Sequence, residues 1–401
     1  MTNISLPFIW LITLIVGLPQ LSETVYTPSL PDIAYSLHAS EEMVEFTLTI
    51  YLLSFAIGTL FWGKLSDKLG RKPCILAGMV IYIIGSAGCY LSDSIQILMV
   101  ARFIQAFGGS IGSVLGQAIC RDAFHGPKLG QAYSIIGSSL AIFPAIGPLV
   151  GGLIAENFGW QNIFLFLVIF AIVLGLLIAK YLPETHNITN RIPISILDVA
   201  LKLVKDKNVI GFGLIVAACN GITFSYFAEG SFYLIEILGF SPSSYGFSFI
   251  LIAVSTMCGG IFSKKLLTSH PAQTVMKYGI FIVITSNGIF SSFIILNSHV
   301  WPAPIFLVIT ISILCQMCNM FGVCMATSNA LALALVDFKW CIGAASSLFG
   351  FFYYTLISLF TFGMGYLHNG TLIPMPLYFL SISMFMVIVR KTLLTKLYQV
   401  P

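Results

Sequence analysis

The sequence predicts an all-α membrane protein with twelve transmembrane helices, and its composition and length lead to this fold class. The chain has 401 residues, of which 58% are hydrophobic and only 8% are charged, whereas soluble domains carry about 25% charged residues. Inside a bilayer only helices and closed barrels satisfy every backbone hydrogen bond. About 20 apolar residues cross a hydrocarbon layer about 30 Å thick, so the chain has room for roughly a dozen helices.

Apolar runs separated by Pro, Gly and charge clusters place these helices in two sets of six. The first set covers 7–27, 43–62, 74–92, 95–120, 130–155 and 159–181. The second set covers 208–234, 244–262, 275–297, 302–334, 340–365 and 372–390. The longest polar stretch, PETHNITNRIPISILDVALKLVKDK, separates the sets and predicts a linker with a short surface helix. We therefore expect two six-helix bundles, at 1–181 and 208–401, joined by a cytoplasmic linker at 182–207.

The basic residues predict the orientation of the chain, because Lys and Arg gather in cytoplasmic loops. All but one of the 19 Lys and Arg fall on one side of the membrane if both termini are cytoplasmic. This topology accounts for the net charge of +4 without a nucleic-acid partner. We expect a multi-pass protein of a bacterial cytoplasmic (inner) membrane that works as a monomer in the lipid bilayer.

Cysteine and histidine usage predicts neither a metal site nor a cofactor. The nine Cys lie inside apolar runs or at their ends, and the six His fall in or beside predicted connections. We therefore interpret the cysteines as small packing residues and expect no buried histidine proton relay. The sequence shows no polar catalytic cluster and no nucleotide-binding loop, which argues against an enzyme and against ATP-driven transport.

Two ionisable residues fall inside predicted helices at similar depth. Arg102 lies on the order of 10 Å into the membrane from Ile95, and Glu23 lies about 24 Å from Pro7 along its helix, at about 1.5 Å per residue. An ionisable residue inside a span is costly and usually marks a pathway. We expect the two to share one cavity that serves proton coupling. The alternative is that Glu23 faces the headgroups and Arg102 bonds neighbouring backbone.

Glu229 has a comparable place in the first helix of the second set. It lies about 30 Å along that helix from Val209, which brings it close to the membrane surface. Two interpretations stay open at this point. Glu229 is either a second residue of the proton-coupling machinery or a side chain at the interface that is solvated by headgroups and water.

Three segments resemble signatures of one transporter family. GKLSDKLGRKP, at 63–73, resembles the loop signature of the major facilitator superfamily. RFIQAFGGSIGSVLGQAICRD, at 102–122, resembles that family's fourth-helix motif, and PAIGPLVGGLIAENFGWQNIF, at 144–164, resembles the fifth-helix motif of its drug:proton antiporters. The matching gate positions are Gly63, Asp67, Gly70, Arg71 and Asp122. The matching antiporter positions are Pro144, Gly147, Pro148, Gly151 and Gly152.

Local similarities narrow the resemblance to the bicyclomycin/chloramphenicol resistance (Bcr/CflA) type of exporter. They are VYTPSLPDIA at 25–34, EGSFYLIEILGFSPSSYGFSF at 229–249, and TSNALALAL with GAASSLFG within 327–350. The resemblance implies two pseudosymmetric bundles around a cavity that opens alternately to each side. It also implies a cytoplasmic gate, in which Arg71 pairs with Asp122 and Asp67 faces the N-terminal end of the helix at 340–365.

Together these observations predict proton-coupled export of small lipophilic or drug-like compounds by alternating access. The expected partners are the small-molecule substrate, protons and the bilayer, with no cofactor. We expect an apolar, aromatic cavity whose candidate residues are Tyr26, Tyr51, Phe55, Tyr133, Phe143, Phe224 and Tyr226. The alternatives are a major facilitator transporter of a specific metabolite, peptide or siderophore and, less favoured, a non-transporting membrane sensor or an enzyme.

Overall fold

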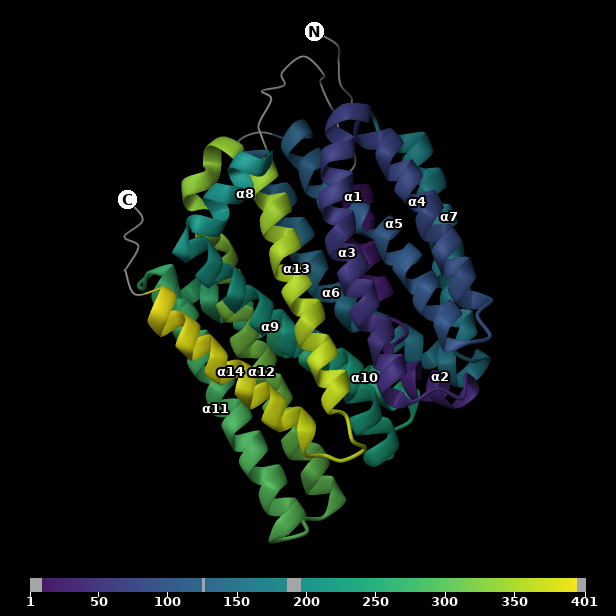
Figure 1. Cartoon of the computed structure of the whole chain (residues 1–401), viewed down its shortest axis with the longest axis vertical. Coiled ribbons are helices and arrows are strands. Elements are labelled where there is room, and N and C mark those ends of the chain that lie inside the picture. Colours follow the sequence, from purple (N-terminus) through teal and green to yellow (C-terminus); the bar gives the residue numbers. More distant parts are fainter. Residues whose placement is uncertain (1–8, 125–126, 186–195, 395–401) are drawn as a thin grey trace. The chain divides into compact units, whose positions relative to one another are not determined.

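The described residues are helical, with short turns and no strand (Figure 1). This computed structural model describes residues 9–124, 127–185 and 196–394, apart from some side chains, most of them within 127–141. The chain divides into two compact units, Met1–Ser195 and Ile196–Pro401.

The first unit is formed by long helices connected by short turns. Its elements are α1 (Ile9–Thr24), η1 (Thr27–Ser29), α2 (Leu30–Ser36), α3 (Glu41–Leu69), α4 (Arg71–Tyr90), α5 (Ile95–Ala123), α6 (Pro127–Phe158) and α7 (Gln161–Tyr181). α1 ends at Thr24, three residues before the end of the helix predicted at 7–27, and Pro28 and Pro31 lie in the first turns of the helical segments that follow. A proline has no backbone N–H to continue the preceding helix but is accepted in a first turn.

The charged segment at 63–73 is helical on both sides of one glycine, which corrects the expectation of a loop there. α3 continues to Leu69 and α4 begins at Arg71. Gly70 makes the turn with φ of +101°, a conformation that residues with a Cβ rarely adopt. Hydropathy indicates only the part of a helix that lies in hydrocarbon, so charged helix ends outside it resemble a loop in the sequence.

The α3, α4 and α5 helices pack closely enough to hold α5 in a fixed position. Trp62 Nε1 on α3 donates to the Phe107 carbonyl at 2.7 Å, and Ser54 Oγ donates to the Phe103 carbonyl at 2.6 Å. On α4, a Cβ at Gly85 would overlap the backbone of Gln105. Glycine at such a position lets two membrane helices approach backbone to backbone. These contacts fix the segment of α5 that carries Arg102.

The second unit contains the remaining helices and one π-helical turn. Its elements are α8 (Ile196–Lys205), α9 (Lys207–Ser231), η3 (Phe232–Ile237), α10 (Pro242–Leu266), α11 (Ala272–His299), α12 (Ile305–Ala334), η4 (Val336–Cys341), α13 (Ile342–Leu367) and α14 (Pro374–Leu393). α8 is a short helix in the segment where one was expected. The helix predicted at 208–234 ends as an α-helix at Ser231 and continues as the wider π turn of η3.

Side-chain to backbone hydrogen bonds connect the helices of the second unit. Ser286 Oγ on α11 donates to the Cys315 carbonyl of α12 at 2.7 Å. Asn287 and Ser291, also on α11, donate to carbonyls of α14 at 3.3 and 2.9 Å. In lipid such bonds and close packing hold helices together, because apolar contacts alone give little preference for helix over lipid.

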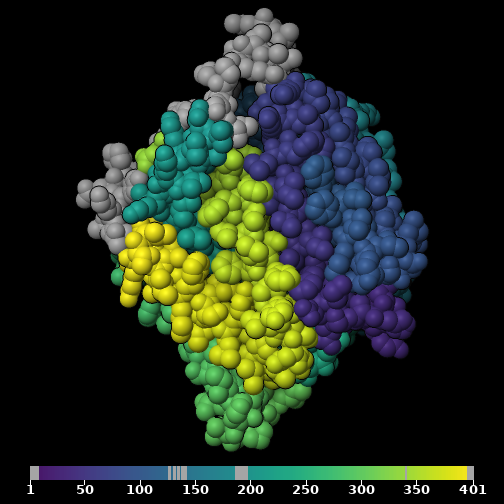
Figure 2. Space-filling view, viewed as in Figure 1, coloured from purple at the N-terminus to yellow at the C-terminus, as the bar shows by residue number. Residues whose placement is uncertain are grey.

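The helices are long and apolar enough for the predicted membrane fold. Among the described residues, eleven spans qualify by length and composition, and Ile142–Phe158 of α6 is a shorter apolar helix. Figure 2 displays the outer surfaces of α13 and α14, in yellow-green and yellow. Large apolar side chains on these two helices are exposed, including Leu359, Phe362, Leu377, Met384 and Ile388. The prediction of an all-α membrane protein is confirmed.

Candidate functional site

Arg102 is fully buried on α5, where aromatic rings surround its guanidinium. Its Cζ atom lies 4.1 Å from the ring centroid of Tyr26 and 4.2 Å from that of Tyr51. Phe164 of α7 contributes a third ring, 6.0 Å away. A cation over the face of an aromatic ring is stabilised by about 0.5–2 kcal/mol, most where water is excluded. The rings therefore offset part of the cost of burying this charge.

A chain of hydrogen bonds fixes the orientation of the Arg102 guanidinium. Its Nη1 donates to Gln105 Oε1 at 2.5 Å and to the backbone carbonyl of Ser22 at 3.4 Å. Gln105 Nε2 in turn donates to Ser86 Oγ at 2.9 Å, which donates to the Tyr82 carbonyl. The guanidinium Nε and Nη2 atoms have no hydrogen-bond partner among the described residues.

Glu23 lies in the last turn of α1, beside the residue whose carbonyl contacts Arg102. Its side chain is 0% exposed, and neither carboxylate oxygen has a hydrogen-bond partner among the described residues. The charge of Arg102 acts on it. A buried carboxylate without hydrogen bonds is costly when charged, and protonation removes that cost. The structure thus brings Glu23 and Arg102 into one buried region and excludes a headgroup-facing position for Glu23.

The glycines of α6 pack against the backbone directly after Glu23. A Cβ on Gly147 would overlap the Thr24 side chain, and a Cβ on Gly151 would overlap the Val25 carbonyl. The other motif positions, Pro144, Pro148 and Gly152, belong to the same helix. These small residues let the α6 backbone contact α1 at the end where Glu23 is held.

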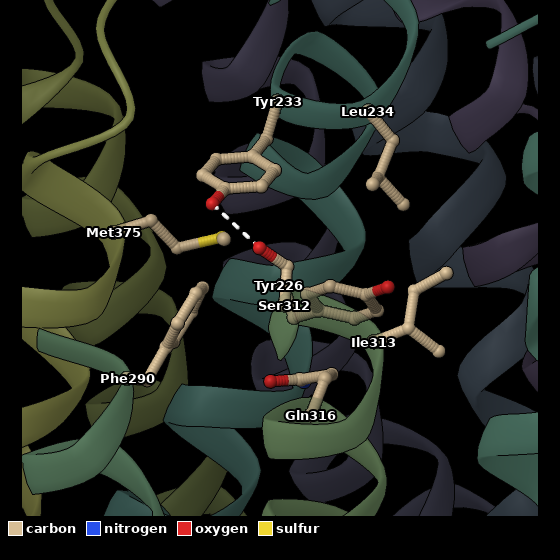
Figure 3. Close-up of a pocket in the computed structure, with 8 residues that line it drawn as sticks. All are labelled: Tyr226, Tyr233, Leu234, Phe290, Ser312, Ile313, Gln316 and Met375. Carbon is tan, nitrogen blue, oxygen red and sulfur yellow. Dashed lines mark hydrogen bonds between the residues drawn. The ribbon is translucent and has the colours of Figure 1, made fainter. Parts of the chain in front are cut away.

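The predicted cavity residues divide among several environments. Tyr26 and Tyr51 contact Arg102, and Phe55 stacks on Tyr51 with centroids 6.4 Å apart. Phe143 packs against Gly17 of α1. In the second unit, Phe224 contacts Phe227, and Tyr226 lines a small pocket (Figure 3). The side chain of Tyr133, on α6, lies outside the described residues.

The gate residues of the first unit form one cluster around Arg71. Its Nη1 lies 2.7 Å from Asp67 Oδ1, and its Nε lies 2.9 Å from Asp122 Oδ2. Nη1 also donates to Ser66 Oγ at 2.7 Å. Asp67 stays 62% exposed although it is paired, whereas the Arg71 side chain is 10% exposed. Gly63 lies one turn before this cluster on α3, and Gly70 makes the turn into it.

Glu184, which the sequence did not single out, caps the N-terminus of α4. Its two carboxylate oxygens accept from the backbone N–H groups of Arg71 and Lys72 at 2.9 and 3.1 Å. An anion is favoured at a helix N-terminus, where N–H groups lack helical partners. The segment after α7 is therefore tied to the turn at Gly70. Glu184 follows Leu-Pro in a polar stretch, so the sequence pattern suggested only a linker.

Glu229 lies near the end of α9 and is bonded to a histidine. Its Oε2 lies 2.8 Å from His368 Nδ1, and the Glu229 side chain is 0% exposed. The Glu229 side chain is therefore not solvated, contrary to that part of the second interpretation. The His368 side chain is itself only 7% exposed, so a histidine beside a predicted connection takes part in a buried contact. His368 follows α13 and resembled a loop residue because Asn and Gly come directly after it.

Comparisons with known proteins agree with this architecture. A model of the Major Facilitator Superfamily matches residues 12–361. An uncharacterized transporter of Rickettsia bellii is 34% identical over 93% of both chains. A bicyclomycin resistance protein homolog of Haemophilus influenzae is 29% identical over 86% of this chain and 85% of its own.

The solved structures supply an independent comparison of the fold. A bacterial homolog of the human lysosomal transporter Spinster, in an inward-facing and unoccupied conformation, superposes with a TM-score of 0.70. The match covers 95% of this chain and 94% of that one at 14% sequence identity, so it concerns the fold alone. The family model, the relatives and the fold agree, and the chain belongs to the Major Facilitator Superfamily, whose members are secondary transporters rather than enzymes.

Proposed function

We propose that this transporter exports small lipophilic or drug-like compounds in exchange for protons. The observation that carries the proposal is Glu23, a fully buried carboxylate without a hydrogen bond among the described residues, beside the equally buried Arg102. A structural carboxylate in such a place is normally hydrogen-bonded. An unbonded one near a fixed cation is suited to bind and release a proton while the rest of the site stays in place.

In this mechanism the proton changes the charge of the Glu23 and Arg102 pair by one. Neutral Glu23 leaves the buried cation uncompensated except for its aromatic rings and Gln105, while ionised Glu23 compensates it. We propose that an external proton binds Glu23, that the bundles rock inward, and that substrate binding favours proton release to the cytoplasm. A membrane potential of about 100 mV contributes roughly 2.3 kcal/mol for each charge moved.

The Arg71 cluster is the proposed cytoplasmic gate. Its ion pairs with Asp67 and Asp122 join the end of α3 to the end of α5, and Glu184 holds the turn between α3 and α4. We propose that Asp67 engages the N-terminal end of α13 in the outward-facing state, as the family resemblance implies. The exposure of the Asp67 side chain supports this role, because an exposed carboxylate can change partners at little cost.

The direction of transport and the topology complete the proposal. Export is supported by the antiporter-type motif of α6, which packs directly against Thr24 and Val25, and by the relative described as a bicyclomycin resistance protein homolog. The distribution of Lys and Arg supports two cytoplasmic termini. We propose a multi-pass monomer in a bacterial cytoplasmic membrane.

Expression in a bacterial strain that lacks its own exporters tests the function. Wild type should raise resistance to some members of a panel of toxic lipophilic compounds, and each such compound should trigger proton efflux from acidified vesicles. Glu23→Gln should lose both effects, while Asp93→Asn, which changes an exposed carboxylate between α4 and α5, should retain them. A wild type that gives neither resistance nor compound-driven proton flux contradicts the proposal.

A further inference from the structure

A short amphipathic helix, α8, lies directly before the first spanning helix of the second unit. α8 covers Ile196–Lys205 and is too short to cross a bilayer, whereas α9, which is long and apolar enough to do so, begins at Lys207. Only Asp206 separates the two helices, and its carboxylate caps α9 by accepting from the N–H groups of Asn208 and Val209 at 2.8 and 3.4 Å. α8 is therefore held next to the membrane surface.

One side of α8 packs on the second unit. Val199 and Leu203, which are four residues apart, are 0% and 5% exposed. Figure 1 shows α8 beside the start of α13, and these two helices are in contact. Because α8 is fixed along this side, its other faces keep a constant orientation to the unit.

A second apolar face of α8 is exposed. Leu197, Leu201 and Val204 are 69%, 52% and 70% exposed. Their spacing of four and three residues places them on one face of the helix, and Ala200 lies between that face and the buried side. Large aliphatic side chains in this place favour contact with lipid over contact with water.

The same helix carries basic side chains beside the exposed apolar face. Lys205, in the last turn of α8, and Lys207, at the start of α9, are both exposed. The one acidic residue of α8, Asp198, is four residues from Lys202, the spacing at which opposite charges offset each other on a helix surface. The Asp206 carboxylate is engaged by the N-terminus of α9. Lys205 and Lys207 therefore supply the charge that α8 offers to a partner.

We infer that α8 lies in the headgroup layer and binds anionic phospholipids of the leaflet beside it. Leu197, Leu201 and Val204 face the acyl chains. The ammonium groups of Lys205 and Lys207 contact the lipid phosphates, since a long lysine side chain reaches a phosphate while its stem stays on apolar surface. A helix with this division of side chains binds at a membrane interface, and each lysine near an anionic surface strengthens attachment about fivefold. The lipid contact requires only the membrane fold and is independent of the proposed export.

Amide hydrogen exchange of the full chain in lipid nanodiscs tests this contact. Wild type is placed, as a single copy in each disc, in phosphatidylcholine alone or in phosphatidylcholine mixed with the anionic phosphatidylglycerol. Exchange of residues 197–206 should be slower by at least about tenfold in the mixed lipid, because two lysines then contribute. Exchange within α11 is the internal reference and should be equal in both lipids.

Two double variants test whether the charge effect belongs to α8. Lys205→Gln with Lys207→Gln should remove the difference in exchange between the two lipids. Lys264→Gln with Lys265→Gln removes the same charge from exposed lysines in the last turn of α10 and should keep the difference. All variants are compared as monodisperse protein on size exclusion.

Removal of the apolar face is a separate test. Leu197→Gln with Leu201→Gln should speed exchange of residues 197–206 at least about tenfold in the mixed lipid, because two leucines lose their contact with acyl chains. Leu267→Gln changes an exposed leucine that follows α10 and should leave this exchange unchanged.

Exchange rates of residues 197–206 within twofold of each other in the two lipids would overturn the contact with anionic lipid. A lipid difference that persists after both Lys205→Gln and Lys207→Gln would overturn it as well. Slow exchange that persists in detergent micelles would mean that the chain itself or a second copy covers the leucines, which also contradicts the contact. Loss of the lipid difference in the α10 double variant would assign the effect to overall charge and not to α8.

Discussion

Glu23 in the first unit and Glu229 in the second are both fully buried near the end of a long helix, and these two glutamates are held differently. Glu23 of α1 has no hydrogen bond among the described residues and is attracted by the permanent cation of Arg102. Glu229 of α9 is bonded to His368, a side chain that can itself take up or release a proton. Burial alone therefore does not identify a proton-coupling residue. The chemistry of the neighbouring group also matters. A proton on Glu23 changes the charge beside the permanent cation of Arg102, whereas a proton on Glu229 can be shared with His368.

Of the variants that distinguish the two glutamates, Glu23→Gln is expected to have the largest effect on proton flux. The amide keeps the size of the side chain but cannot bind or release a proton, so substrate-driven proton flux should fall at least tenfold, which corresponds to about 1.4 kcal/mol. Flux is measured in proteoliposomes with a pH-sensitive dye and a compound found in the resistance screen. Retention of more than half of the wild-type flux would assign proton coupling to another residue.

Arg102→Lys is expected to have the next largest effect. Lysine keeps the charge but loses the planar contact with Tyr26 and Tyr51 and the geometry of the bond to Gln105. We expect transport to fall about tenfold, consistent with a cation–π loss of about 0.5–2 kcal/mol. Gln105→Glu changes the partner of Arg102 instead of Arg102 itself, and it keeps an acceptor for the guanidinium. Full activity of Arg102→Lys would mean that charge alone matters at this position.

Glu229→Gln and His368→Gln are expected to have smaller, equal effects. Each removes one partner of the same hydrogen bond, so the double variant should be no worse than either single variant, with a coupling energy of about 0.5–3 kcal/mol. The coupling energy is obtained from a double-mutant cycle, which compares the transport rates of the two single variants and the double variant with wild type. If Glu229→Gln lost proton flux as completely as Glu23→Gln, the two glutamates would have the same role, contrary to this prediction.

Glu184→Gln is expected to have the smallest effect on transport. Both oxygens of this carboxylate are bonded to the N-terminus of α4, so its role is structural. Loss of a helix cap costs about 0.5–2 kcal/mol, which should appear as a lower unfolding temperature with proton coupling intact. Asp93→Asn, which changes an exposed carboxylate between α4 and α5, is the control and should leave the unfolding temperature unchanged.

Hydropathy and motif spacing predicted the membrane helices and drew attention to Glu23, Arg102 and Glu229, because a charge inside an apolar run stands out. The same criteria missed Glu184 and His368. Both lie in polar segments that resemble connections, and their partners are 113 and 139 residues away in the sequence. Gln105 was missed because a single uncharged amide in a glycine-rich helix stands out neither in hydropathy nor in motif spacing. The π turn was missed because FYLIEI is as apolar as a regular helix.

Proton release on substrate binding measures whether Glu23 carries the transported proton. Purified protein in a weakly buffered solution is mixed with a compound that wild type exports, and the released protons are counted with a pH indicator. We expect release from wild type and from Glu229→Gln, and none from Glu23→Gln although it still binds the compound. Equal proton release from wild type and Glu23→Gln would contradict the assignment of the transported proton to Glu23.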